Sequence, residues 1–169
     1  MTSIVGWALV NSQVTSAPYY EAAHAKIQAL KRAGILPAAA RVGIGSRCLD
    51  TPHRGRGLLA ALRGQLYRQV APALDLYFAT IMHHNVPSLR YHQREGYTPV
   101  AQDADKTYFT FPVAQGAQQL PPAAALAAPY LVRPGRPEDA AALGTLNQKW
   151  AYTARNTDMA HGFLMSVYS

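Results

Sequence analysis

The sequence has one cysteine, few charged residues and no long apolar run. Cys48 is the single cysteine among 169 residues, so an internal disulfide is excluded and a reducing compartment, the cytoplasm, is expected. The longest apolar stretches, such as residues 122–129, are far too short to span a bilayer. The first residues also lack the charged start, apolar run and cleavage site of a secretory signal. We therefore expect a protein of the cytoplasm with no membrane partner.

The chain also lacks any run of five or more basic residues, although its net charge is +7 and its pI is about 9.8. Such a charge invites a nucleic-acid partner, but no motif that mixes aromatic and basic residues is present. The basic residues are densest at Arg54 and Arg56, and at Arg90 and Arg94. A small molecule with several phosphates would use this charge as well, so we expect no nucleic-acid partner.

Apolar periodicity predicts alternating strands and helices. The apolar fraction of 49% and the charged fraction of 15% are typical of a globular domain. Strands are predicted at residues 4–10, 41–49, 75–82, 97–101 and 107–113, and helices at 20–33, 57–70 and 87–95. This order predicts an α/β (α+β) domain of three layers, with a central mixed sheet flanked by helices.

The turn between the second strand and second helix carries the clearest chemical signal. Cys48 and Leu49 end the strand, and Gly55 and Gly57 precede a helix that opens with Leu58 and Leu59. Glycines let an anion approach the backbone, and the free N–H groups and dipole of a helix N-terminus attract phosphate. The alternative is a tight turn whose arginines, Arg54 and Arg56, are merely solvated.

This turn resembles the acetyl-CoA loop of the GNAT superfamily of N-acetyltransferases, written Arg/Gln-x-x-Gly-x-Gly/Ala. Arg54 and Gly57 match it, whereas Leu59 stands where glycine or alanine is usual. The resemblance implies a mostly antiparallel mixed sheet and an acetyl-CoA cosubstrate. It also implies that backbone amides of residues 49–59 hold the pyrophosphate and pantetheine, with the strand that ends at Cys48 alongside the pantetheine arm.

A second segment supports the first. Asn85, Ser88, Gly96 and Tyr97 follow the third predicted strand, and they resemble the second GNAT motif, Asn-x-x-Ser/Ala followed by Gly-Phe. The resemblance implies that Asn85 and Ser88 contact the cofactor where the sheet splays open. The alternative is that this pair only starts a helix.

Catalytic residues are harder to assign. Many GNAT relatives place a tyrosine on this helix that protonates the departing thiolate, and His92 stands at the matching position. Histidine can also donate a proton near neutral pH, so His92 is the candidate catalytic residue. The alternative is a half-buried helix histidine without a catalytic role. Tyr91 should point about 100° away around the helix.

The base that takes the proton of the amine is not visible. Thr80 and Met82 occupy the positions where relatives place a carboxylate. Asp50 is expected to cap a turn, and Cys48 to pack rather than act as a nucleophile. His83 and His84 are candidates through water, or are exposed loop residues. The histidines lack metal-ligand spacing, so we expect no metal.

The segments occur in an unusual order. A GNAT-like core fills residues 1–113, an Ala/Gln/Pro linker follows at 114–129, and residues 130–169 resemble a GNAT opening strand and helix. This tail could complete its own core by circular permutation, complete that of a partner in a swapped homodimer, or begin a second copy. No segment is predicted to form the second strand, which favours exchange between chains. Trp150, Tyr152 and Phe163 would then line an acceptor pocket or pack in the core.

Two functions follow from this reading. The first is transfer of an acetyl group from acetyl-CoA to a primary amine of a small molecule or peptide, by direct attack in a ternary complex. The second is an acyl-CoA-binding or regulatory module with weak or no turnover.

Overall fold

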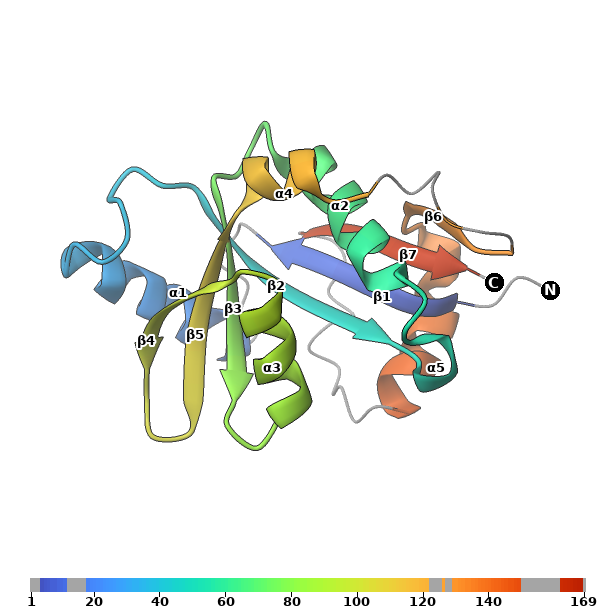
Figure 1. The fold of residues 1–169 in the computed structure, drawn as a ribbon, viewed down its shortest axis with the longest axis horizontal. Helices are drawn as coiled ribbons and strands as arrows, with labels where there is room; N and C mark the ends of the chain where they lie inside the picture. The colour runs from blue at the N-terminus through green and yellow to red at the C-terminus, as the bar shows by residue number, and fades with distance from the viewer. Residues whose placement is uncertain (1–3, 12–17, 122–125, 127–128, 150–161, 169) are drawn as a thin grey trace.

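The computed structural model describes residues 4–11, 18–121, 126, 129–149 and 162–168. Seven strands form one sheet in the order β4-β5-β3-β2-β1-β7-β6 (Figure 1). The strands are β1 (Ile4–Asn11), β2 (Val42–Leu49), β3 (Leu76–Met82), β4 (Thr98–Gln102), β5 (Lys106–Pro112), β6 (Leu131–Pro134) and β7 (Gly162–Tyr168). Only β2 and β3 pair in parallel, and the other five pairings are antiparallel. The predicted mixed, mostly antiparallel sheet is confirmed.

Helices cover both faces of the sheet (Figure 1). One face packs against α2 (Leu58–Val70), α3 (Val86–Arg94) and α4 (Val113–Gln119), and the other packs against α1 (Pro18–Arg32) and α5 (Ala140–Lys149). Strand alternation explains the two faces, because Ala8 and Val10 join the α2 cluster while Trp7 and Leu9 join the α5 cluster. Within the described residues, no helix is long and apolar enough to cross a membrane.

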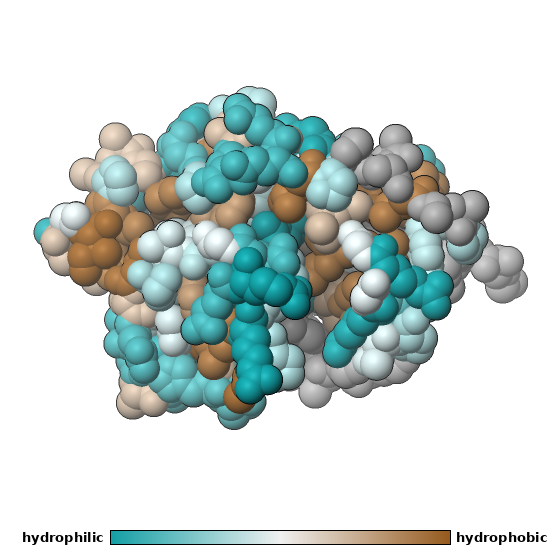
Figure 2. Space-filling model, viewed as in Figure 1, coloured by the Kyte–Doolittle hydropathy of each residue, from teal (hydrophilic) through white to brown (hydrophobic). Residues whose placement is uncertain are grey.

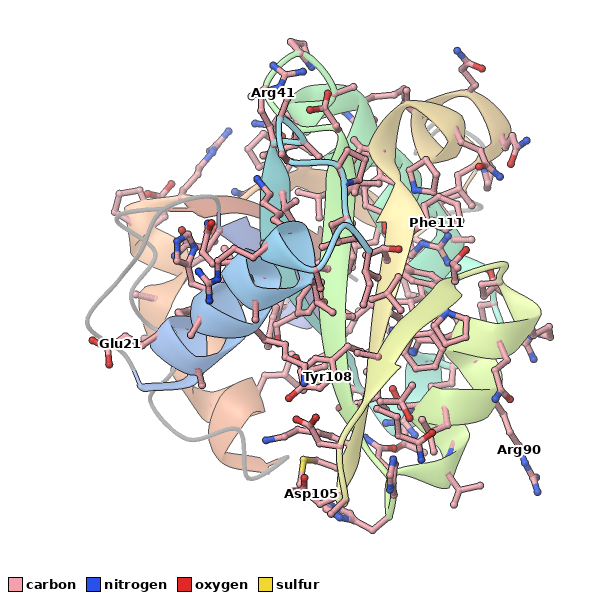
Figure 3. All side chains as sticks on the ribbon, turned by 90° about the vertical axis from the view of Figure 1, so that its left-hand side faces the viewer. Glu21, Arg41, Arg90, Asp105, Tyr108 and Phe111 are labelled. Carbon is pink, nitrogen blue, oxygen red and sulfur yellow. The ribbon has the colours of Figure 1, made fainter. Side chains whose placement is uncertain are left out.

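Helix α1, which lies between β1 and β2 in the chain, is held on the sheet by apolar packing and by hydrogen bonds to Asp103. Its Ile27 and Leu30 pack with Phe78 of β3 and Tyr108 of β5. Tyr108 points to the side of the sheet that α1 covers, and Phe111 points to the other side (Figure 3). Asp103 accepts hydrogen bonds of 2.6 Å from Lys26 Nζ and from the Tyr108 hydroxyl. These two hydrogen bonds connect α1 to the β4–β5 hairpin.

The first part of the expected linker is helix α4 rather than irregular chain. Val113 and Gly116 are buried, and the missing side chain of Gly116 leaves room for the Tyr67 ring of α2. Arg68 of α2 donates hydrogen bonds to the carbonyl groups of Ala117, Leu120 and Pro121. Composition alone hid this helix, because its alanine and glutamine residues show no apolar periodicity, and the helix is held on α2 through Val113 and Gly116.

The C-terminal segment supplies a strand that the sequence analysis did not predict. β7 pairs antiparallel with β1, from Asn11↔Gly162 to Ile4↔Tyr168, and β6 pairs with the other edge of β7. The expectation that no segment forms a second strand is therefore wrong. A single chain makes both pairings here. Trp150 and Tyr152 lie outside the described residues, and Phe163 is opposite Val10 in the ladder.

Strands β2 and β3 separate soon after they begin. Their parallel pairing covers only Val42↔Leu76, Gly43↔Tyr77 and Ile44↔Phe78, although β2 continues to Leu49 and β3 to Met82. The Tyr77 ring lies over Gly45, where a Cβ atom would be 1.7 Å from the ring. β2 stays paired with β1 from Ile44 to Leu49, and β3 with β5 along its full length, so the sheet opens in its middle.

Adding a methyl group at Gly45 should destabilise the fold. Gly45→Ala would force the Tyr77 ring out of place, and overpacking of this kind costs about 1–3 kcal/mol. Chemical denaturation measures the loss. Gly144→Ala, inside α5 with no atom within 4 Å of the added Cβ, is the matched control and should leave stability equal or higher. Equal stability of the two variants would contradict the close contact at Gly45.

A cross-link between β1 and β7 should form within one chain. Ala8 and Met165 are opposite each other, so Ala8→Cys with Met165→Cys, in a Cys48→Ala background, is expected to close a disulfide. On a non-reducing gel the product should migrate as a monomer of about 18.3 kDa. A covalent dimer would instead indicate that chains exchange residues 130–169.

Candidate functional site

A cavity of about 1060 Å³ occupies the opening between β2 and β3. Its walls are the separated ends of the two strands, the loop and first turn of α2, and one side of α3. Figure 2 shows the surface hollowed between α3 and α2, with apolar side chains visible inside and hydrophilic ones around it. The lining residues comprise residues 45–49 of β2, 79–82 of β3, Arg54, Gly55, Gly57, Leu58, Leu59, Ala60, His84, Asn85, Pro87, Ser88, Tyr91, His92, Arg94 and Glu95.

The glycine turn lies where this cavity meets the N-terminus of α2. Gly55 and Gly57 have φ angles of 76° and 73°, a left-handed conformation that favours glycine. Gly57 is the N-cap of α2, and no side chain caps the first turn. Arg54 donates a hydrogen bond of 3.1 Å from Nε to the Leu49 carbonyl, which fixes the turn against the end of β2. The positive end of the α2 dipole therefore faces a space that can admit an anion.

Ten of the eleven predicted site residues line this single cavity. They are Cys48, Leu49, Arg54, Gly55, Gly57, Leu58, Leu59, Asn85, Ser88 and His92. Arg56 is the exception. Its guanidinium lies over the Tyr130 ring at 5.9 Å, and His53 Nδ1 is 3.1 Å from the Tyr130 hydroxyl. The segment that leads into β6 thus contacts the outer side of the glycine turn.

Asn85 and Ser88 start α3 in addition to lining the cavity. The Asn85 side-chain oxygen accepts a hydrogen bond from the Ser88 backbone N–H at 3.3 Å, which is an N-cap interaction. The Ser88 carbonyl in turn accepts a hydrogen bond of 2.6 Å from His92 Nδ1. The start of α3 therefore sets the orientation of the His92 ring one turn later.

His92 is a neutral acceptor in this arrangement. It exposes only 2% of its surface, and burial, with the nearby Arg47 charge, lowers the pKa of His92 to about 3. Because Nδ1 carries the proton that bonds Ser88, Nε2 has a lone pair, and Arg47 Nη2 lies 2.5 Å from it. The imidazole has no proton at Nε2 to donate near neutral pH, which argues against the predicted proton transfer from His92.

Arg47 is the main cavity residue that sequence analysis missed. It lies on β2 beyond the last residue that pairs with β3, and its Nη1 donates a hydrogen bond of 2.7 Å to the Tyr97 hydroxyl. The guanidinium also lies 5.0–5.5 Å from the ring centres of Tyr77, Tyr91 and Tyr97. The signal was a lone arginine in a strand of otherwise uncharged residues, on the face that also carries Gly45 and Leu49.

Arg47 stays charged at any working pH. Burial lowers the pKa of Arg47, but the surrounding tyrosines, Tyr97 first, raise it well above its ordinary value. Behind the tyrosines, Arg63 of α2 is fully buried and donates to the Tyr91 hydroxyl at 2.7 Å. The interior of the cavity is therefore positively charged.

Acidic groups are scarce at this site. Among the described lining residues Glu95 is the only carboxylate, and it is paired with Arg63 at 3.2 Å and with Arg94 at 3.3 Å. Asp50 accepts a hydrogen bond from the Thr51 N–H, so its predicted turn-capping role is confirmed. Thr80 and Met82 line the cavity, and the buried Thr80 hydroxyl has no hydrogen-bond partner in the described part of the chain.

The remaining candidates give no metal centre or second base among the described residues. His83 Nε2 is 3.2 Å from the Thr107 hydroxyl, and the exposed His84 lines the cavity. No cluster of three or more histidine, cysteine, aspartate or glutamate side chains that could hold a metal ion occurs in the described ranges.

The chain resembles several solved acetyltransferase structures at low sequence identity. No family model matches the sequence, and no curated protein matches it. SsHAT aligns with a TM-score of 0.46 and 16% identity over 64% of this chain and 66% of its own. yncA from Salmonella typhimurium, solved with its cofactor acetyl-CoA, aligns with a TM-score of 0.42 and 18% identity over 64% of this chain and 58% of its own. An N-acetyltransferase from Staphylococcus aureus Mu50 aligns with a TM-score of 0.41 and 18% identity over 64% of this chain and 61% of its own. The chain thus spans less than two thirds of each.

The Cys48 thiol should react slowly with alkylating reagents at neutral pH. Burial raises the pKa of this thiol to about 11, against a smaller lowering by the Arg54 charge, and the Asp50 charge adds the smallest contribution, in the direction of burial. The reactive thiolate is therefore scarce below that pH in the folded protein. Alkylation followed by mass spectrometry against pH measures this, with the urea-unfolded chain as control. A native rate that rises near pH 8 would contradict the buried, neutral thiol.

Proposed function

We propose that this protein is a GNAT-type acyltransferase that transfers the acetyl group of acetyl-CoA to a primary amine. The observation that carries the proposal is the cavity between β2 and β3, which meets the glycine turn and the N-terminus of α2. Two sequence motifs that lie 31 positions apart, counted from Arg54 to Asn85 (85 − 54), line this same cavity from different elements.

The cavity offers a suitable group for each part of the donor. The pyrophosphate would bind the free N–H groups of the first turn of α2, beside Gly55 and Gly57, with Arg54 close by. The pantetheine arm contains amides and is extended. It would lie along residues 45–49 of β2, where that edge no longer pairs with β3 and the backbone groups need partners. The thioester would then reach the inner end of the cavity near α3.

Transfer would occur by direct attack of the amine on the thioester. Cys48 is buried among Trp7, Leu9 and the apolar side chains of α5, with a neutral thiol, so a covalent intermediate on this residue is disfavoured. A water-mediated route through the exposed His84 is available for the amine proton. The acceptor would approach between the separated strands, where Thr80 and Met82 are positioned.

A second function, binding of acyl-CoA without turnover, has one specific observation in its favour. Glu95, the sole carboxylate among the described lining residues, is held in ion pairs by Arg63 and Arg94, so both arginines compete with an amine proton for it. With its carboxylate engaged in this way, the function keeps the cavity and the loop but removes the chemical step.

We also propose that residues 130–168 complete the sheet as a circularly permuted opening segment. In support, β6, α5 and β7 come last in the chain but lie next to β1, the first strand. A homodimer in which chains exchange this segment is the alternative.

Gly57→Glu should abolish coenzyme A binding, because it places bulk and negative charge where the phosphates would bind. Titration calorimetry with coenzyme A measures the affinity. Gly34→Glu is a matched control, because Gly34 has a φ angle of 70° and equally open surroundings but lies after α1, away from the cavity. The control should lose stability by a similar amount and keep the wild-type affinity. Unchanged affinity in Gly57→Glu would refute the assigned phosphate site.

Thiol release from acetyl-CoA, measured over a panel of amines, distinguishes an acetyltransferase from a protein that only binds acyl-CoA. Release that depends on both amine and protein supports transfer. Tight coenzyme A binding without release across the panel supports the binding module instead.

A further inference from the structure

The Arg47–His92 pair occupies the inner end of the cavity. Arg47 comes from β2 and His92 from α3, so the pair bridges the two walls between which the thioester would lie. The guanidinium contacts the Tyr97 hydroxyl, His92 Nε2, and the faces of Tyr77, Tyr91 and Tyr97. Its position is therefore set by the fold rather than by a ligand.

His92 acts on Arg47 through a fixed tautomer. The Ser88 carbonyl holds the proton on Nδ1, which leaves Nε2 free to accept from Arg47. Within the pair Arg47 is the member with a charge, and His92 is the member that orients it. Any hydrogen-bond acceptor of similar reach at position 92 could do the same.

We infer that Arg47 stabilises the coenzyme A thiolate as it leaves, with His92 as a positioning residue, so that this site uses a fixed cation in place of a proton donor. The inference rests on the proposed acetyl transfer. A preorganised charge of this kind lowers the barrier where negative charge develops, and it needs no reorganisation during the reaction.

The step is balanced without a protein acid. The amine lone pair forms the C–N bond, the C–S bond breaks, and its electron pair stays on sulfur as a thiolate beside the Arg47 guanidinium. The amine loses its proton to solvent, and solvent later protonates the released thiolate. No group of the Arg47–His92 pair changes protonation.

The pKa of the thiol of bound coenzyme A tests the inference without knowledge of the amine. A cation within about 4–6 Å lowers such a pKa by about 1–3 units from its ordinary value near 8.5. The ultraviolet absorbance of the thiolate, titrated against pH with saturating protein, reports it. Cys48 ionises only near pH 11, and the coenzyme-free protein corrects for it.

The variants separate charge from structure. Arg47→Gln should return the thiol pKa to that of free coenzyme A and lower kcat about 100-fold, with KM for acetyl-CoA little changed. Arg47→Lys keeps the charge and should keep the lowered pKa. Arg32→Gln removes one charge from the exposed end of α1 and should behave as wild type. Thermal unfolding of each variant confirms that it is folded.

Two variants at position 92 test whether His92 acts as a hydrogen-bond acceptor or as a proton donor. Glutamine can accept a hydrogen bond from Arg47 but cannot protonate a thiolate, and phenylalanine can do neither. His92→Gln should therefore remain close to wild type in kcat, and His92→Phe should fall. Equal losses in both variants would overturn the inference in favour of acid catalysis by His92.

The proposed function and this inference fail in different ways. Absence of coenzyme A binding by the wild-type protein would overturn both. Binding with the same thiol pKa in the wild-type protein and in Arg47→Gln would overturn the inference alone. A lowered thiol pKa that requires a cation at position 47 would support it.

Discussion

The early separation of β2 from β3 is the constraint on which the site depends. A parallel pair that continued to Leu49 and Met82 would leave no cavity and no unpaired strand edge. Pairing stops after three residues on each strand, and the Tyr77 ring lies over Gly45 at the point of divergence. Beyond it, Arg47 and Tyr91 line the cavity between the walls. Because β1 and β5 hold the outer edges, the strands can part without losing the sheet.

A buried cation inside this opening needs compensation. Removal of a guanidinium from water costs free energy. At this site, contacts with tyrosine rings and a hydroxyl offset part of that cost. Arg63 is compensated separately by Glu95 and Tyr91. An anionic ligand would gain from such a charge without reorganising the site. The arginine is thus understandable as a group retained for chemistry, since an apolar residue would pack there at lower cost.

Local signals were strong enough to predict most of the fold and the loop, but not three features. The glycine turn and both helices beside the cavity follow from residue types with strict geometric demands. Helix α4 escaped notice because its fit depends on Gly116 meeting Tyr67, a contact across 49 residues (116 − 67). β7 was missed because the short apolar run at residues 162–168 has no periodicity that distinguishes a buried strand from a segment of buried helix. Arg47 was missed because its role depends on where His92 and Tyr97 converge.

The segment that completes the sheet also contacts the glycine turn. β1 is buried along almost its whole length, so it needs β7 on one edge and β2 on the other, and α5 over Trp7 and Leu9. β2 in turn forms one wall of the cavity. Tyr130, just before β6, contacts His53 and Arg56 on the outer side of the glycine turn. The described parts of residues 130–168 are therefore linked to the glycine turn through two routes, one by way of the sheet and one by direct contact.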